Sequence, residues 1–150
     1  METGGDIGLK YKCISHYFKF RIDEHVRKYG VTGVQLGIIL RLLQMEDQGI
    51  PEIHQKDLEK AVNVTHPTMT EIIKKLEAKG LVECRKSEAD GRAKAIFSTG
   101  KARDMASEIP AVGNMVFADL TEGIPEDEVE TMRKVIDLMM NKIKSTKERN

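Results

Sequence analysis

Hydrophobic positions recur at helical spacing along most of the chain. At the start they fall three and four residues apart, which predicts a long amphipathic helix over residues 7–28. Gly30 is expected to end that helix, and Thr32 to cap a second one over residues 33–47, which stops at Gly49-Ile50-Pro51. The apolar positions that carry the two patterns are Ile7, Tyr11, Ile14, Phe18 and Ile22, then Leu36, Ile39, Leu40 and Leu43.

Two shorter helices are predicted next, over residues 55–62 and 66–79, with Asn63-Val64-Thr65 as the turn between them. Thr65 is a suitable N-cap for the second helix. Four apolar residues of that helix lie at positions i, i+3, i+4 and i+7, so they share one buried face. They are Met69, Ile72, Ile73 and Leu76.

The hydrophobic period then changes to that of a β-hairpin. Residues 81–86 and 94–98 are strand-like, and Asp90-Gly91 between them is a turn signal because both residues tolerate positive φ. Two short helices joined by a tight turn and followed by a hairpin form a winged helix-turn-helix. The predicted fold class is therefore mainly α with a small two- to three-stranded β-wing, and the winged helix-turn-helix spans residues 32–98.

Helical spacing returns from Thr99, in a helix that Pro110 should kink. Gly123-Ile124-Pro125 ends it, and three acidic residues begin a last helix, where they suit the positive end of the helix dipole. Its apolar residues alternate three and four apart, which is the seam expected of a helix that packs on a partner. They are Val129, Met132, Ile136, Met139 and Ile143.

Charge is uneven along a chain that is neutral overall, with 24 Lys and Arg against 24 Asp and Glu. Residues 55–103 hold eleven basic and seven acidic residues, a net charge of +4, whereas residues 104–141 have a net charge of −7. Overall neutrality argues against general adhesion to nucleic acid. A binder that confines its positive charge to one helix and one hairpin remains compatible with these numbers.

The composition also bounds the compartment. Two cysteines, Cys13 and Cys84, exclude a disulfide framework and suit a reducing cytosol. No apolar run approaches the roughly 20 residues that a bilayer crossing needs, and the N-terminus lacks the order of charges of a signal peptide. We therefore expect a cytoplasmic protein with no membrane partner.

The tip of the hairpin points to DNA. Arg92 lies beside Asp90 and Gly91, where its guanidinium could enter a minor groove of negative potential. Asp90 is expected to hold the Arg92 side chain extended by a charge-assisted hydrogen bond. The alternative is a winged-helix adaptor that binds protein and does not bind DNA. In that case Lys74, Lys75 and Arg92 would be dispensable for binding any anionic partner.

Three stretches of the sequence together resemble the MarR family of bacterial transcription regulators: residues 53–58, 64–82 and 90–94. The resemblance assigns the recognition helix to residues 66–79 and the Asp and Arg of the wing to Asp90 and Arg92. His54 stands where the family has a small hydroxyl cap, and residues 98–102 also depart from the family pattern. The resemblance further implies a homodimer built from residues 1–31 and 99–150, which the apolar surplus of both end helices favours independently.

DNA contacts follow from this assignment, and the site divides into three groups. Gln55, Thr65 and Thr68 are expected to bind phosphates, and His66, Pro67 and Thr70 to lie nearest base edges. The third group is basic or belongs to the wing: Lys74, Lys75, Arg85, Lys86, Asp90, Arg92 and Lys94. A two-fold dimer would need an inverted-repeat operator with half-sites about 34 Å apart.

The expected function is that of a homodimeric transcriptional repressor that binds double-stranded DNA. A small-molecule effector is expected to lower its affinity for DNA. The effector would bind where the dimer helices meet the DNA-binding region, among His16, Tyr17, Phe20 and Arg41.

Other classes of function find less support. The chain has no phosphate-binding glycine loop, no nucleophile elbow and no paired carboxylates beside a histidine, so neither an enzyme nor a cofactor is expected. Asp23-Glu24-His25 is better explained as a solvated helix face than as a metal site. Cys13 leaves redox sensing open as an alternative, although a small buried hydrophobe is the usual role of a free cysteine.

Overall fold

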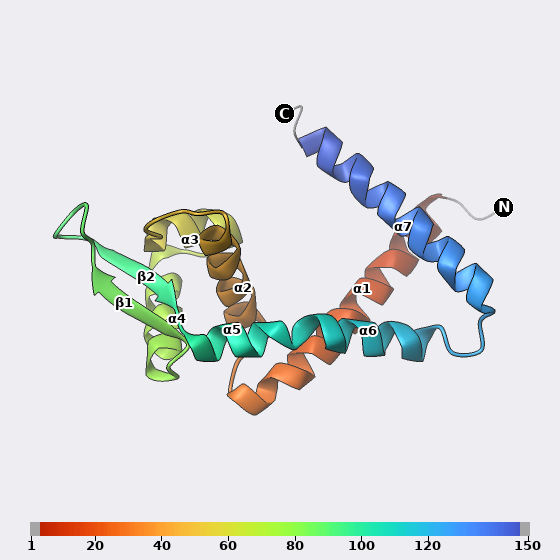
Figure 1. The fold of residues 1–150 in the computed structure, drawn as a ribbon, viewed down its shortest axis with the longest axis horizontal. Coiled ribbons are helices and arrows are strands. Elements are labelled where there is room, and N and C mark those ends of the chain that lie inside the picture. Colours follow the sequence, from red (N-terminus) through yellow and green to blue (C-terminus); the bar gives the residue numbers. More distant parts are fainter. Residues whose placement is uncertain (1–3, 148–150) are drawn as a thin grey trace. The chain divides into compact units, whose positions relative to one another are not determined.

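The computed structural model describes residues 4–147, whose helices and strands are drawn in Figure 1. In chain order they are α1 (Gly4–Val26), the 3-10 helix η1 (Arg27–Tyr29), α2 (Gly33–Asp47), α3 (Gln55–Val62), α4 (His66–Ala78), β1 (Val82–Lys86), β2 (Lys94–Ser98), α5 (Gly100–Ser107), α6 (Ile109–Leu120) and α7 (Glu126–Lys147). The predicted fold class is confirmed. The outermost residues of the predicted dimerisation regions, 1–3 and 148–150, lie outside the described part.

Breaks in the hydrophobic pattern coincide with helix boundaries. Gly30 follows η1 with a φ of 68°, a left-handed conformation that glycine adopts without strain. The Thr32 hydroxyl accepts the Gln35 N–H at 3.2 Å, and the Gln35 side chain accepts the Thr32 N–H at 3.2 Å. This reciprocal capping box fixes the start of α2 as the sequence predicts.

The hydrophobic core lies where α2, α3 and α4 meet the hairpin and α5. Each large apolar side chain removed from water there contributes roughly 1.5–3 kcal/mol to stability. Met69, Ile73 and Leu76 of the predicted buried face are buried, and Ile72 is half-buried. The least exposed side chains of the core include Ile39, Leu42, Leu58, Met69, Leu76, Leu81 and Met105.

The wing is an antiparallel pair in which Cys84 lies opposite Ile96. A third strand is reduced to one bridge, since the Ile96 N–H donates to the Ile53 carbonyl at 2.8 Å. That bridge joins the hairpin to the segment before α3. Figure 1 shows the hairpin beside α3 and α4.

Pro110 breaks the helix that it was expected to kink. α5 ends at Ser107 and α6 begins at Ile109, so Pro110 occupies the first turn of a new helix, where the proline needs no N–H donor. The Glu108 carboxylate, at the break, accepts hydrogen bonds from Tyr29 Oη at 2.5 Å and from His25 Nε2 at 2.7 Å. The break is therefore tied to the end of α1 and to η1.

The chain divides into two compact units, residues 1–113 and 114–150. In the first, α1 exposes many large apolar side chains, namely Ile7, Leu9, Tyr11, Ile14, Tyr17 and Phe20. In the second, α7 exposes Met132, Val135, Ile136, Leu138, Met139, Met140 and Ile143. The predicted apolar surplus of both helices is thus present at the protomer surface. Within residues 4–147, no helix combines the length and apolar character that crossing a membrane requires.

Candidate nucleic-acid interface

The turn between α3 and α4 is tight because Asn63 adopts a left-handed conformation, with φ 51°. Asparagine tolerates this conformation better than most residues. Thr65 precedes α4 but does not cap it as predicted, because its hydroxyl pairs with the Thr68 hydroxyl at 2.8 Å and makes no cap bond to a backbone N–H. The two hydroxyls nevertheless lie together and exposed at the start of α4, where phosphate contacts are expected.

Gln55 joins α3 to α4 through one amide nitrogen. Its Nε2 lies 2.8 Å from Glu59 Oε1, 2.8 Å from Thr70 Oγ1 and 3.1 Å from the His66 carbonyl oxygen. All three neighbours can accept a hydrogen bond, which matches the donor character of the amide nitrogen. Gln55 is therefore a fixed element of the helix-turn-helix, in addition to the phosphate contact predicted for it.

Glu59 is a functional candidate that the sequence analysis missed. Its Oε1 lies 2.6 Å from His66 Nδ1, and its side chain is 18% exposed against 68% for His66. The pKa of Glu59 is lowered, first by the hydrogen bond from Gln55 and then by His66. The signal that could have revealed it is spacing, because Glu59 lies one helical turn after Gln55.

A cleft of about 120 Å³ brings together predicted contact residues from three elements. Gln55 of α3, Thr70 and Lys74 of α4, and Lys94 of β2 line it. Cys84 also lines the cleft, and burial, followed by the nearby charge of Glu77, raises the pKa of its thiol. The recognition helix thus shares one concave surface with the base of the wing.

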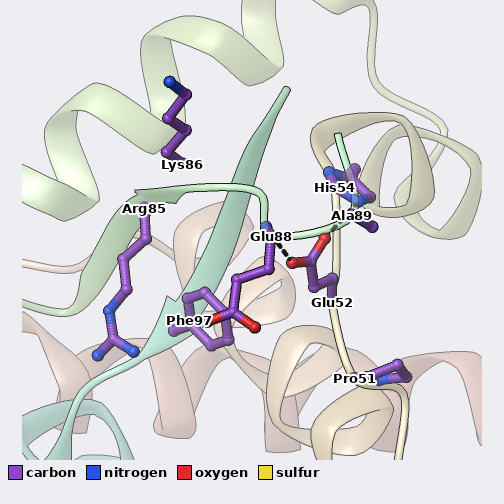
Figure 2. A pocket seen from close by; sticks show the side chains of 8 residues that line it. All are labelled: Pro51, Glu52, His54, Arg85, Lys86, Glu88, Ala89 and Phe97. Atoms are coloured by element: carbon purple, nitrogen blue, oxygen red, sulfur yellow. Dashed lines mark hydrogen bonds and ion pairs between the residues drawn. The ribbon is translucent and has the colours of Figure 1, made fainter. Parts of the chain in front are cut away.

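The base of the wing is attached to the segment before α3 by Glu52, a second residue that the sequence analysis missed. Glu52 accepts the Ser87 hydroxyl at 2.5 Å and the Glu88 N–H at 2.8 Å, and Figure 2 shows the second contact. These bonds lower the pKa of Glu52. Ser87 also accepts the Asp90 N–H at 3.0 Å, so the start of the loop between the strands is held in place.

The tip of the wing differs from the prediction. Neither Asp90 nor Gly91 has a positive φ, because the loop runs over seven residues, 87–93, and needs no tight turn. The Asp90 carboxylate accepts the backbone N–H of Arg92 at 3.1 Å and makes no bond to its guanidinium. Among the described residues, the guanidinium of Arg92 has no hydrogen-bond or ion-pair partner, so it is exposed and free to bind a ligand.

Arg85 and Lys86 leave β1 on opposite sides, as Figure 2 shows. Arg85 forms a two-point ion pair with Glu83, at 3.1 and 3.0 Å, and its guanidinium lies 4.7 Å from the centre of the Phe97 ring. Its charge is therefore balanced on the hairpin itself. Lys86 extends beside Gly91 of the wing tip, where it is exposed.

His54 precedes α3 without capping it through its ring. Its N–H donates to the Asp57 carboxylate at 2.8 Å, and its Nδ1 lies 3.0 Å from the Lys94 carbonyl oxygen. Because a carbonyl only accepts, Nδ1 carries the proton there. The histidine that departs from the family pattern thus connects the start of α3 to β2.

The four residues predicted for an effector pocket are only partly brought together. His16, Tyr17 and Phe20 are exposed on α1, and Tyr17 Oη accepts from Arg21 at 3.0 Å. Arg41, on α2, donates to Gln44 at 2.6 Å, while its Nε is buried and lacks an acceptor among the described residues.

Two further expectations concern α1. Cys13 is exposed in the protomer, so the expectation of a buried, packed thiol is wrong at this position. In the described part of the chain, no group of three ligating side chains lies close enough to bind a metal, at Asp23-Glu24-His25 or elsewhere. His25 binds Glu108 instead.

The winged helix has known relatives. The model of the MarR family matches residues 29–93, from the end of η1 to the loop before β2. This segment is therefore similar to the winged helix of the MarR family.

Solved structures of MarR-family regulators extend the likeness of fold beyond the matched segment. MepR, a transcription regulator of the Staphylococcus aureus multidrug efflux pump MepA, has a TM-score of 0.74 at 21% identity, covering 95% of this chain and 99% of MepR. The S. aureus MepR–DNA complex has a TM-score of 0.68 at 22% identity, covering 89% and 96%. The transcription regulator MarR from Oenococcus oeni PSU-1 has a TM-score of 0.57 at 27% identity, covering 90% and 98%.

Proposed function

We propose that this chain is a MarR-type, sequence-specific regulator that binds double-stranded DNA as a homodimer in the cytoplasm. The observation that carries the proposal is the cleft shared by Gln55, Thr70, Lys74 and Lys94. The recognition helix and the base of the wing share this concave surface, where Lys74 and Lys94 lie beside Glu77 and apolar side chains. A surface shared in this way suits α4 in a major groove with the wing beside it. The DNA complex of MepR, a protein with the same fold, supports this choice of ligand.

The charge of this surface supports the same ligand. Lys74, Lys86, Arg92 and Lys94 are exposed, and none of their side chains has an ion-pair partner among the described residues. Lys75 approaches Glu71 only at 3.7 Å on an exposed helix face, an interaction that contributes little in water. Arg85 is proposed to contribute less to DNA binding than these residues, because it already forms an ion pair with Glu83. Phosphate binding would therefore rest on α4 and the wing tip.

A homodimer is supported by the apolar side chains that α1 and α7 each expose. Ile136 and Ile143, on the α7 seam, are 38% and 49% exposed. Met132 and Met139, on the neighbouring turns of α7, are also exposed. Apolar surface on this scale marks an interaction site on a water-soluble protein. A two-fold dimer would repeat the recognition helix, so its operator would be an inverted repeat.

The regulator is proposed to act as a repressor that a small molecule releases. His16, Tyr17, Phe20 and Arg41 remain the candidate pocket. The buried Arg41 Nε favours this region, because a buried donor without an acceptor is costly and a ligand oxygen would satisfy it. The chemistry of the pocket, two aromatic rings with a histidine and an arginine, suits an aromatic acid or a similar polar aromatic compound.

The experiment that tests DNA binding is footprinting of the purified protein over the promoter next to its own gene. Two protected half-sites of inverted sequence, about one helical turn apart, are expected. A variant with Lys74→Ala, Lys75→Ala and Arg92→Ala should lose the footprint. If the wild-type protein protects no bases, the adaptor alternative replaces this proposal. If the triple variant protects the same bases as the wild type, DNA binding does not use this surface.

A further inference from the structure

We propose that Glu59 fixes which ring nitrogen of His66 faces the DNA, and that base preference at one position of each half-site therefore changes with pH. The inference rests on the proposed DNA binding and adds a specificity-determining pair to it. His66 stands at the first position of α4, and its side chain is 68% exposed. Glu59 reaches it from α3.

The proton of the His66 ring can be placed from its neighbours. Glu59 Oε1 lies 2.6 Å from Nδ1, and a carboxylate oxygen only accepts, so Nδ1 carries a hydrogen and donates. Gln55 Nε2 is also 3.1 Å from Nδ1, but an amide nitrogen is a donor and cannot accept that hydrogen. The two amide hydrogens of Gln55 are directed instead to Glu59 Oε1 and Thr70 Oγ1, each at 2.8 Å. Nδ1–H is thus the form of the ring that the arrangement stabilises.

The consequence is that Nε2 faces outward. Among the described residues no side chain or carbonyl pairs with the Nε2 atom of His66. When the ring is neutral, Nε2 can only accept, which fits the amino group of adenine or cytosine in the major groove. When the ring is protonated, Nε2 donates and carries charge, which fits guanine N7 and O6 instead.

The surroundings of Glu59 favour its ionised form. Its side chain is 18% exposed, and its pKa is lowered, first by the hydrogen bond from Gln55 and then by the one from His66. The other charged group that faces Glu59 is Lys56, one turn earlier on α3, and a lysine stays protonated over this range. Histidine is the side chain that titrates between pH 5 and 8.

The first test needs no DNA. Nitrogen-15 NMR of the full chain at pH 8 reports directly which ring nitrogen of His66 is protonated. A protonated Nδ1 and an unprotonated Nε2 are expected. The same spectrum of Glu59→Gln should show a mixture of the two neutral forms, because a carboxamide can donate as well as accept. A wild-type ring protonated at Nε2 would overturn the inference while leaving DNA binding untouched.

The second test measures base preference. Dissociation constants are measured at pH 5.5 and pH 8.0, at one ionic strength, for operators carrying each of the four bases at every half-site position. At one position the ratio of affinities for adenine or cytosine over guanine should fall about threefold to tenfold on acidification, the effect of exchanging one hydrogen bond. His66→Ala should remove this dependence at that position alone.

Arg92→Ala is the matched control, because it should weaken binding to every operator and leave the change of the base ratios with pH intact. If wild-type protein binds the operators with the same base ratios at both pH values, the inference fails and the proposed function stands. If no duplex binds at either pH, both fail.

Discussion

The Glu52 carboxylate lies 2.5 Å from the Ser87 hydroxyl, and the bond between them attaches the wing to the segment that leads into α3. Ser87 is buried, and the second oxygen of Glu52 holds the Glu88 N–H. One side chain therefore fixes where the wing loop begins relative to the recognition helix. A contact of this kind should affect DNA binding without touching DNA.

Replacing Glu52 by alanine is expected to loosen the wing, because the buried Ser87 hydroxyl and the Glu88 N–H both lose their acceptor. Amide hydrogen exchange at residues 87–90 should accelerate, and affinity for the operator should fall about threefold to tenfold, since a mobile wing orders on binding. Glu88→Ala, an exposed neighbour, is the control. Unchanged exchange in Glu52→Ala would show that the wing is held by other contacts.

Arg92 and Arg85 should behave differently although both belong to the wing region. Arg92→Ala is expected to cost about 1–3 kcal/mol of DNA-binding free energy, as other groove-contacting arginines do. Arg85→Ala should change affinity less than about twofold, because Glu83 and Phe97 already engage its guanidinium. Fluorescence anisotropy with a labelled operator measures both. Equal losses in the two variants would place Arg85 on the DNA surface after all.

Glu108 predicts a defined dependence of stability on pH. Hydrogen bonds from Tyr29, Lys28 and His25, in that order, lower its pKa to about 2, against 4.5 for the free side chain. A depressed carboxyl pKa contributes stability above pH 4.5, and this contribution is lost as the pH falls from there toward 2. Glu108→Gln should therefore melt at a lower temperature than wild type at pH 7 and at a similar temperature near pH 2.

Thermal unfolding followed by circular dichroism at several pH values measures this difference. Asp104→Asn, on an exposed face of α5, is the control and should show no such convergence. A constant gap between wild type and Glu108→Gln from pH 7 to pH 2 would contradict the assignment of the stabilising charge to Glu108.

Dimerisation should depend on the α7 seam. Ile136→Asp would place a charge in the proposed interface of both protomers, so the dimer should dissociate at micromolar protein concentrations. Lys134→Asp, at an exposed position away from the seam, should leave the dimer intact. Light scattering after size-exclusion chromatography distinguishes the two. A wild-type monomer would show that the exposed apolar residues of α7 serve another partner.

Local chemistry made much of the fold predictable. The periodic apolar residues gave the helices, and Thr32 with Gln35 formed the cap that hydroxyl chemistry favours. The effect of Pro110 was harder to predict, because a proline either kinks or breaks a helix, depending on the contacts that the residues around it make. Here Glu108 is held by Tyr29, 79 residues away in sequence, and no local pattern contains that contact.

The candidate site was predictable in its location but only partly in its contacts. α4 and the wing loop carry the residues expected, and Lys74 and Lys94 share a cleft with Gln55 and Thr70. The ion pair of Arg85 was not predicted. Side chains alternate along β1, so Arg85 and Glu83 lie on one face, where they bind each other, and Cys84 lies on the other face. Glu52 and Glu59 were missed because acidic residues near DNA are unexpected until their partners are seen.

The Cys13 side chain shows a different limit. A free cysteine in an amphipathic helix is usually packed, yet this one is exposed in the protomer because the apolar surface of α1 is itself uncovered.

The most direct test of the central claim is the salt dependence of DNA binding. Anisotropy titrations of the duplex from the promoter beside its own gene, between 50 and 300 mM salt, should give log affinity falling linearly with log salt at about −0.9 per phosphate contacted. Several contacts per protomer predict a steep line even though the chain as a whole has zero net charge. Absence of salt-sensitive binding at low-micromolar protein would contradict the proposed function.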